Sequence, residues 1–271
     1  MKRRDFLTTS CAAGLAATGL ANAQAQEPNV KRQLIELRTY TVANADKKAQ
    51  LIAILDAAAI PAWNRLGIEP VGVLTFQPDD NADNPKLDAA TLALQVTVVL
   101  PHPTPESVLT ANRALLADEA YVQGAAAILN APMNDPVYLR YESSLSLGFA
   151  DCPTVTAPTK AAERVLQLRI YESHNAVKAV KKVAMFNEGG EIAIFRKCGM
   201  PPVFFGESLI GDKLPNLTYM LAFDDMAAKE AGWKAFIGSP EWEALKGDPQ
   251  YADTVSNITN LVLRPTPGSQ V

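Results

Sequence analysis

Apolar and polar positions along the chain follow two periods, one typical of strands and one typical of helices. Apolar residues alternate with polar or small ones through residues 92–98 and 217–223, which predicts two strands with one strongly apolar face each. Between Asn44 and Gly67 the spacing is helical instead, and Asn44, Asp46 and Gly67 are suited to start and end that helix. The stripe consists of Leu51, Leu55, Ala58, Ala59, Ala62 and Leu66.

These elements belong to a tandem repeat. The string Leu34-Ile35-Glu36-Leu37-Arg38-Thr39-Tyr40 returns as Val165-Leu166-Gln167-Leu168-Arg169-Ile170-Tyr171, with Arg169 following Arg38 by 131 residues. After each string the same order follows: a helix, two strands, a helix and a strand. The predicted ranges are 45–66, 68–77, 91–100, 105–129 and 136–143 in the first half, and 175–198, 201–210, 216–224, 225–247 and 254–264 in the second. Each half is therefore predicted to be a β-α-β-β-α-β unit of the ferredoxin-like type.

The fold class is thus α+β, with a first repeat over 31–144, a linker rich in Ser, Thr, Pro and Ala over 145–163, and a second repeat over 164–266. A sheet with helices on one side leaves its other face bare. Here that face is semi-polar, with Ala93, Gln95, Thr97, Thr218, Met220 and Ala222. Stacking the two sheets as a dimeric α/β-barrel covers it, either within one chain or by pairing each half with another subunit.

Residues 1–25 are predicted to be a signal peptide. The string Arg3-Arg4-Asp5-Phe6-Leu7 has the twin-arginine pattern, and a mildly apolar run precedes small residues that allow cleavage near Ala23 or Ala25. The expected location is therefore the periplasm. No segment is apolar enough to predict a stable membrane span.

The composition of the chain limits the classes of molecule that are expected to bind to it. Removing residues 1–23 takes the net charge from −4 to −6, which disfavours nucleic acid as a partner because phosphate binding needs a concentrated basic face. Cys152 and Cys198 remain after cleavage, either bridged or as two thiols, and they give no metal pattern. We expect no metal site and no cofactor.

The second half carries a longer set of strings that resembles a known family. They are Met185-Phe186-Asn187-Glu188-Gly189-Gly190-Glu191, Pro202-Val203-Phe204-Phe205-Gly206-Glu207, Leu214-Pro215-Asn216-Leu217-Thr218-Tyr219, and Trp233-Lys234-Ala235-Phe236 before Ser239-Pro240-Glu241-Trp242. With the Leu-Arg-x-Tyr strands they resemble the bacterial NIPSNAP family. The resemblance implies a dimeric α/β-barrel, and a homo-oligomer fits it. The resemblance does not identify any catalytic residues in this chain.

The candidate ligand-binding residues come from the repeated strands. Arg38 and Tyr40 share one strand face, as do Arg169 and Tyr171, and we expect both pairs to point into the barrel because the first strand of each sheet is central. Glu36 could pair with Arg38. Its counterpart in the second half is the neutral Gln167, which leaves Arg169 available for an anionic or carbonyl-bearing ligand or for a structural network at the barrel seam.

The remaining candidates are His174, Glu188 and Glu207. His174 follows the repeated strand and could be an acid–base group or part of a helix cap with Asn175. Glu188 and Glu207 could be buried acids or ordinary structural groups. His102, between Pro101 and Pro103, is expected at the surface. Trp233 and Trp242 are expected to be packing anchors.

The sequence therefore predicts a protein that binds a small organic molecule in the barrel, with its activity unknown. The alternatives are a non-enzymatic binding or scaffold protein and a cofactor-free monooxygenase-like enzyme. Gly-x-Ser-x-Gly is absent from the chain, as is any phosphate-cradling glycine loop. A deep cavity with converging polar groups favours ligand binding, and a filled barrel favours a scaffold.

Overall fold

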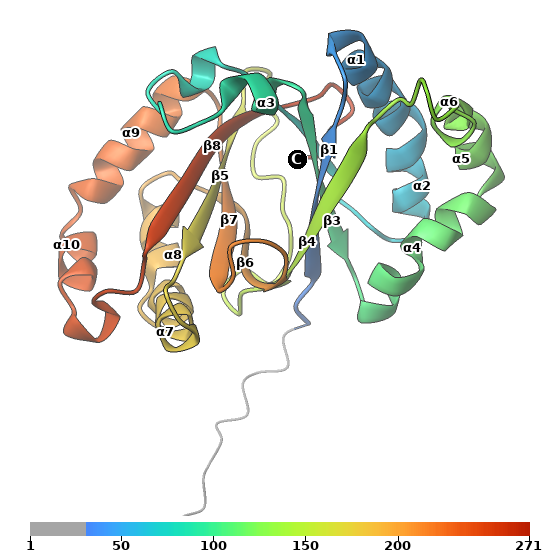
Figure 1. The fold of residues 1–271 in the computed structure, drawn as a ribbon. Coiled ribbons are helices and arrows are strands. Elements are labelled where there is room, and N and C mark those ends of the chain that lie inside the picture. Colours follow the sequence, from blue (N-terminus) through green and yellow to red (C-terminus); the bar gives the residue numbers. More distant parts are fainter. Residues whose placement is uncertain (1–30) are drawn as a thin grey trace, which may run out of the picture. The chain divides into compact units, whose positions relative to one another are not determined.

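The computed structural model describes residues 31–271, and the predicted signal peptide lies outside the described residues. Residues 31–271 form a closed eight-stranded antiparallel barrel with helices packed outside it (Figure 1). Among these residues the structure contains no helix with the length and apolar character that a bilayer crossing requires.

The first half of the described chain contributes four strands, most of its helices on one side of the barrel, and two short helices at one end of the barrel (Figure 1). Its strands are β1 (Leu34–Thr41), β2 (Gly72–Phe76), β3 (Gln95–His102) and β4 (Arg140–Gly148). Its helices are α1 (Ala45–Ile54), the π-helix η1 (Leu55–Ala59), α2 (Ile60–Arg65), the 3-10 helix η2 (Asp79–Asn81), α3 (Ala89–Ala93), α4 (Pro105–Ala117), α5 (Glu119–Gly124) and α6 (Ala126–Leu129).

The second half repeats this order on the other side of the barrel. Its strands are β5 (Val165–Glu172), β6 (Pro202–Ile210), β7 (Asn216–Phe223) and β8 (Asn257–Pro265). Its helices are α7 (Ala176–Phe186), α8 (Glu191–Lys197), α9 (Met226–Ile237), α10 (Pro240–Lys246) and the 3-10 helix η3 (Pro249–Tyr251).

The strand order around the barrel is β1-β3-β2-β8-β5-β7-β6-β4, and every neighbouring pair is antiparallel. Within each half the order is fourth, first, third, second, so the first strand of each half has neighbours on both sides. The halves meet at the β2–β8 and β4–β6 pairs. The barrel thus closes within one chain, without strands from another subunit.

Matching caps start the first helix of each half. The Asn44 side chain accepts a hydrogen bond from Lys47 N before α1, and Asn175 accepts one from Lys178 N before α7. At the far end of α2, Gly67 adopts the left-handed conformation with φ +73°. The predicted start at Asn44 and end at Gly67 are therefore confirmed.

Two element boundaries differ from the prediction. The strand predicted from residue 91 begins at Gln95, because Asp88 caps α3 by accepting a hydrogen bond from Thr91 N. The strand predicted over 136–143 instead covers Arg140–Gly148. Its last residues are needed at the seam, where Ser146 pairs with Ser208.

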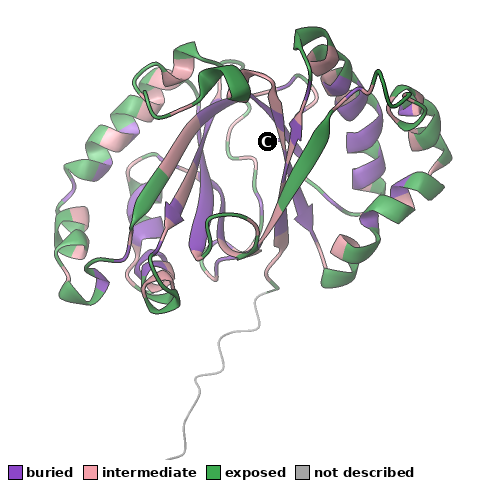
Figure 2. Ribbon diagram, in the orientation of Figure 1, coloured by how far each residue is buried: buried purple, intermediate pink, exposed green. Residues whose placement is uncertain are grey.

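Buried side chains form two large outer clusters, one inner cluster and a small fourth cluster of Ile54, Ala58 and Ala125. The outer clusters lie between the helices and the sheet of each half, around Trp63 and around Phe195. The inner cluster lies within the barrel and includes Ile35, Phe204 and Met220. Figure 2 shows buried residues along most strands and exposed ones on the outer helices, while much of β4 is exposed. The inner cluster occupies only part of the barrel, and the rest is a cavity.

Candidate functional site

The faces of β1 and β5 are reversed relative to the sequence prediction. Leu37 and Thr39 line the cavity inside the barrel, whereas Arg38 and Tyr40 lie on the helix side of the sheet. The pairing of Thr39 with Thr97 requires this, because residues directly opposite in an antiparallel pair point to the same face. The prediction that the arginines point into the barrel is therefore wrong.

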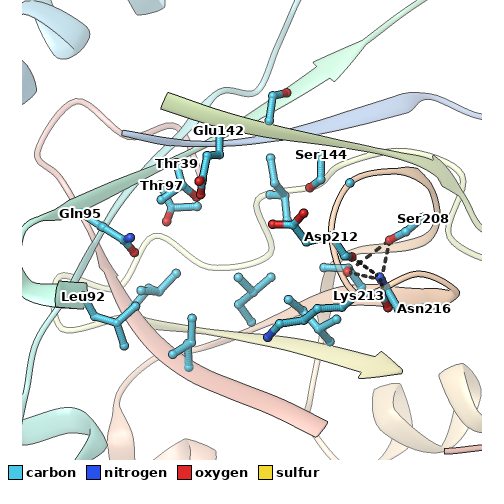
Figure 3. Close-up of a pocket in the computed structure, with 18 of the residues that line it drawn as sticks. Thr39, Leu92, Gln95, Thr97, Glu142, Ser144, Ser208, Asp212, Lys213 and Asn216 are labelled. Atoms are coloured by element: carbon cyan, nitrogen blue, oxygen red, sulfur yellow. Dashed lines mark hydrogen bonds between the residues drawn. The ribbon is translucent and has the colours of Figure 1, made fainter. Parts of the chain in front are cut away.

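The cavity has a volume of about 470 Å³ and lies at one end of the barrel (Figure 3). At this end the chain leaves β1 and β5 and enters β3 and β7. Its lining residues come from all eight strands, from α3 and from the loop after β6: Leu37, Thr39, Phe76, Leu92, Gln95, Thr97, Glu142, Ser143, Ser144, Leu168, Ile170, Ser208, Ile210, Gly211, Asp212, Lys213, Asn216, Thr218, Leu261 and Leu263.

Apolar side chains form the deep part of the cavity. Phe76, Leu168 and Leu263 line it and also belong to the inner cluster that fills the other end of the barrel. Thr39, Thr97 and Ile170, further out, are only half-buried, so the cavity is open to solvent. An amphipathic molecule could place its apolar part on Phe76 and Leu168.

A network of hydroxyl and amide groups occupies one wall. Ser208 Oγ donates to Asn216 Oδ1 at 2.6 Å, and Thr218 Oγ1 donates to the same oxygen at 3.2 Å. Ser208 Oγ also lies 3.2 Å from Ser146 Oγ. These contacts join β4, β6 and β7 and fix the orientation of the Asn216 amide.

The same amide holds the loop that closes part of the opening. Asn216 Nδ2 donates to the carbonyl oxygens of Asp212 at 3.0 Å and Lys213 at 3.1 Å, contacts drawn in Figure 3. Lys213 adopts a left-handed conformation with φ 58°, and its Nζ donates to Thr259 Oγ1 at 3.1 Å. The Asp212 and Lys213 side chains are thereby placed at the cavity.

Around the rest of the cavity, five polar side chains are not engaged with one another. Thr39, Gln95, Thr97, Glu142 and Ser144 make no side-chain hydrogen bond to another residue in the described part of the chain, and Figure 3 shows them around the cavity. Their hydroxyl, amide and carboxylate groups are available to a bound molecule. Gln95, Thr97 and Thr218 are members of the semi-polar face predicted from sequence.

The Glu36–Arg38 pair predicted from sequence is present, although on the helix side. Arg38 Nε donates to Glu36 Oε1 at 2.8 Å, and both side chains are buried. His102 Nε2 lies 3.0 Å from Glu36 Oε2 and Ser143 Oγ donates to Oε1 at 2.7 Å. Burial by itself raises the pKa of Glu36, but the hydrogen bond from His102 and the charge of Arg38 outweigh it and lower the pKa to about 2.

The expectation of a surface His102 is wrong. β3 extends to His102, whose side chain is 1% exposed and lies between Glu36 and Ser107. The ionised carboxylate only accepts hydrogen bonds, so His102 Nε2 is the donor to Glu36. The two flanking prolines suggested a rigid loop, yet His102 pairs with Leu34 in the ladder.

In the second half Arg169 lacks a carboxylate within ion-pair distance among the described residues, as the neutral Gln167 suggested. The Gln167 amide is held by Trp233 Nε1 at 2.6 Å and by Asn260 Oδ1 at 2.7 Å. Arg169 stacks over Trp233 at 4.4 Å and Tyr171 at 5.2 Å, and its buried Nε has no hydrogen-bond partner in this part of the chain. The Tyr171 hydroxyl accepts from Tyr219 at 3.0 Å.

The remaining candidates are dispersed. His174 is exposed before α7, with Nε2 3.8 Å from Asp253 Oδ2, and its neighbour Asn175 provides the cap. Glu188 is exposed between α7 and α8, and Glu207 is half-buried in β6 opposite Leu147. The structure does not bring these three residues to the barrel cavity.

Trp233 and Trp242 pack against the outer cluster of the second half, which confirms them as packing anchors. Cys152 and Cys198 are free thiols, the first buried and the second half-buried. In residues 31–271 there is no group of three or more His, Cys, Asp or Glu side chains arranged to hold a metal ion.

Ser208 and Asn216 are two of the cavity residues that the sequence prediction missed. Asn216 and Thr218 are two apart on β7, and Thr218 belongs to the predicted bare face, so strand alternation could have added Asn216. Ser208 could not be added in this way, because β4 and β6 contain register shifts.

Solved structures share this architecture. A candidate monooxygenase from Lactobacillus acidophilus matches with a TM-score of 0.55 and 11% identity over 86% of this chain and 94% of that chain. One from Fusobacterium nucleatum has the same score, with 9% identity over 86% and 92%. Such identities show the fold alone. An uncharacterised NIPSNAP-like domain protein from Burkholderia xenovorans matches over 39% of this chain and 87% of its own, with 20% identity and a TM-score of 0.35.

No curated protein matches the sequence. The NIPSNAP family model, however, matches residues 166–270. This range corresponds to the second repeat, whose strings suggested the resemblance. Residues 166–270 are thus similar to the NIPSNAP family.

Proposed function

We propose that the chain binds a small organic molecule in the open end of its barrel. The observation that supports this is the half-filled interior: apolar side chains pack one end, and a cavity of about 470 Å³ occupies the other. Protein interiors are normally close-packed, and ligand pockets typically have volumes of roughly 300–1,000 Å³. A barrel with only a scaffold role would gain stability from filling that space.

The lining suggests the chemistry of the ligand. Phe76, Leu168 and Leu263 offer an apolar surface deep inside, and Thr39 and Thr97 offer unengaged hydroxyls nearer the opening. The charged groups are of both signs: the carboxylates of Glu142 and Asp212 and the ammonium of Lys213. A neutral amphipathic molecule with an apolar body and one or two hydrogen-bonding groups fits this pattern.

Two functions are compatible with such a site, and they differ in what happens to the bound molecule. A binding protein releases it unchanged, whereas a cofactor-free monooxygenase-like enzyme releases an oxidised product. Two proteins with this fold are candidate monooxygenases, but at 11% and 9% identity this likeness extends only to the fold. Mass spectrometry of the recovered molecule, with a measurement of oxygen consumed, distinguishes the two functions.

We further propose that each half is a ferredoxin-like repeat. The order of fourth, first, third and second strand in each half supports this. We also propose twin-arginine export to the periplasm, on the strength of Arg3-Arg4-Asp5-Phe6-Leu7. Self-association into a homo-oligomer stays a proposal, and light scattering tests it.

The binding proposal can be tested with N-phenyl-1-naphthylamine, a neutral dye whose fluorescence rises in apolar surroundings. Ile170→Trp places a bulky ring in the cavity, and Leu109→Trp adds the same ring on α4, where Leu109 is 80% exposed. We expect saturable binding to the wild type and to Leu109→Trp, and an affinity at least roughly tenfold weaker for Ile170→Trp, or about 1.4 kcal/mol. Equal binding by all three proteins would refute the barrel site.

A further inference from the structure

A second pocket lies outside the barrel, between the first-half sheet and its helices. It has a volume of about 200 Å³ and is lined by Arg38 and Tyr40 of the sheet, by Trp63 of α2, and by residues of η1, α4 and α5. Its rim includes Leu116 and Tyr141, which are 59% and 40% exposed. Leu37 and Thr39 of the same strand face the barrel cavity, so β1 separates two distinct pockets.

We propose that this pocket is a second ligand site, which binds a small aromatic carboxylate. The inference is independent of the barrel cavity, since the two pockets lie on opposite faces of β1. It depends on four features: a held arginine, a surplus of hydrogen-bond donors, aromatic walls, and a difference between the two repeats.

Glu36 fixes the Arg38 guanidinium through its Nε, and the terminal nitrogens of Arg38 lie at the pocket. Its Nε donates to the buried Glu36 at 2.8 Å, which fixes the guanidinium. Its terminal nitrogens make longer contacts, from Nη1 to Tyr40 Oη at 3.4 Å and from Nη2 to Asn112 Oδ1 at 3.3 Å. Charge-assisted hydrogen bonds to a carboxylate are usually about 2.7–2.9 Å, so these two nitrogens could bind an anionic oxygen more tightly.

Donors outnumber acceptors around the pocket. Tyr121, Tyr138 and Tyr141 have hydroxyls with no hydrogen bond to another described residue, and the Nε1 of Trp63, a residue 1% exposed, has no partner there either. Burial raises the pKa of Tyr40 to about 12 and also raises the pKa of Tyr121 and Tyr138, so their hydroxyls keep their protons. Each of these hydroxyls can donate or accept, whereas the Arg38 and Trp63 nitrogens can only donate, so a ligand that accepts hydrogen bonds is favoured over one that donates them.

The walls fit a ring. Tyr40, Tyr138 and Tyr141 lie with centroids 5.0–6.1 Å apart, and Arg38 Cζ lies 4.8 Å from the centre of the Tyr141 ring. An engineered cavity of about 150 Å³ binds benzene, so the volume here suits one six-membered ring with a carboxyl group.

The second repeat fills the corresponding space. Phe186 follows Leu55 by the repeat distance, and its ring packs on Phe205 at 5.3 Å and Tyr219 at 5.5 Å. In the first repeat Leu55 opens the π-helix η1, which lines the pocket, and π-helical turns are frequent at functional sites. The space that aromatic side chains fill in the second repeat is thus an open pocket in the first repeat.

The test is a calorimetric and NMR titration of the folded protein with benzoate, benzamide and benzylamine. We expect benzoate to bind with a dissociation constant on the order of 0.1–1 mM, in keeping with its few heavy atoms, benzamide more weakly, and benzylamine not at all. Leu55→Phe, which copies the second repeat, should abolish binding. Asn112→Asp, at an exposed position, should weaken benzoate binding roughly tenfold or more by charge repulsion near Arg38.

Crossed controls separate the two sites. Ile170→Trp should leave benzoate binding unchanged, and Leu55→Phe should leave N-phenyl-1-naphthylamine binding unchanged. Circular dichroism shows whether each variant folds, and Asn112→Asp decides the question if Leu55→Phe does not fold. The proposal is overturned if the wild type shows no saturable benzoate binding up to about 10 mM, if benzylamine binds better than benzoate, or if Asn112→Asp binds benzoate as the wild type does.

Discussion

Replacing Glu36 with Gln should both destabilise the protein and remove a defined part of its dependence on pH. Glu36 is 6% exposed, and its carboxylate receives hydrogen bonds from Arg38, His102 and Ser143. The substitution keeps the shape of the side chain and removes the charge. It leaves the Arg38 guanidinium buried without its carboxylate.

Two physical routes give the same magnitude. The pKa of Glu36 falls from an ordinary 4.5 to about 2, and at 1.36 kcal/mol per pKa unit this corresponds to about 3 kcal/mol of stability at neutral pH. Removing one partner of a buried ion pair typically costs about 3–5 kcal/mol. We therefore expect Glu36→Gln to lower the free energy of unfolding at pH 7 by about 3–4 kcal/mol.

The sign of the pH dependence follows from the lowered pKa. The contribution of Glu36 is fully present above the unfolded pKa of about 4.5 and is lost as the pH falls toward 2. Over that interval the wild type should lose stability more steeply than Glu36→Gln. Above pH 5 the two proteins should differ by a constant amount.

Urea unfolding at pH 7, 5 and 3 measures these quantities, with the slope against denaturant checked for constancy. Glu188→Gln is the control, since Glu188 is an exposed carboxylate and should change stability by less than about 0.5 kcal/mol. The reasoning is refuted if Glu36→Gln costs less than about 1 kcal/mol at pH 7, or if it loses as much stability as the wild type between pH 5 and 3.

Three further predictions concern other parts of the chain. Lys182→Met should lower the free energy of unfolding by about 3–5 kcal/mol, measured by thermal or urea unfolding. The reason is that the substitution leaves the buried Glu191 carboxylate, 2.9 Å from Lys182 Nζ, without its partner. A cost below about 1 kcal/mol would contradict this prediction. Asn216→Ala should cost about 1–3 kcal/mol and speed amide hydrogen exchange in residues 211–214, because two carbonyls lose their donor; unchanged exchange there would argue against this role. Replacing Arg3 and Arg4 with Lys should abolish the mature exported form in a cell-fractionation assay, and undiminished export would remove the twin-arginine proposal.

The repeat is predictable because its signal is local. The Leu-Arg-x-Tyr strings, the helical spacing after Asn44 and the alternation in β7 each specify an element without knowledge of the rest of the chain. Their order then gives the strand neighbours. Joining two such sheets gives a barrel, and the structure shows that it closes within one chain, which is one of the two arrangements that the sequence left open.

The face of β1 is predicted wrongly because hydropathy alone does not give the register. Ile35, Leu37 and Thr39 are together less polar than Glu36, Arg38 and Tyr40 and so suggest the helix side, although Leu37 faces the cavity and Arg38 is 5% exposed beneath the helices. The same sequence pattern correctly places Thr97 on the barrel face. If the prediction had paired Thr39 with Thr97 in the β1–β3 ladder, it would have placed Arg38 on the helix side of the sheet. The repeat would then have placed Arg169 on the same side.

The cavity itself could not be predicted from sequence. Its volume depends on how side chains from eight strands fill a shared space, and only the end containing Phe204 and Met220 is filled. The buried position of His102 could not be predicted for a related reason, because it depends on strand pairing. A strand that ends between two prolines looks like a loop until Leu34 is seen to pair with it.

The most direct test of the central claim is native mass spectrometry of the protein purified from its own host without denaturation. The barrel proposal predicts an adduct of a few hundred daltons on the wild type and on Leu109→Trp, released by unfolding and absent from Ile170→Trp. Retention of the adduct by Leu55→Phe places it in the barrel and not in the helix-side pocket. An adduct that persists unchanged in Ile170→Trp, or no adduct on any of these proteins, would contradict the claim.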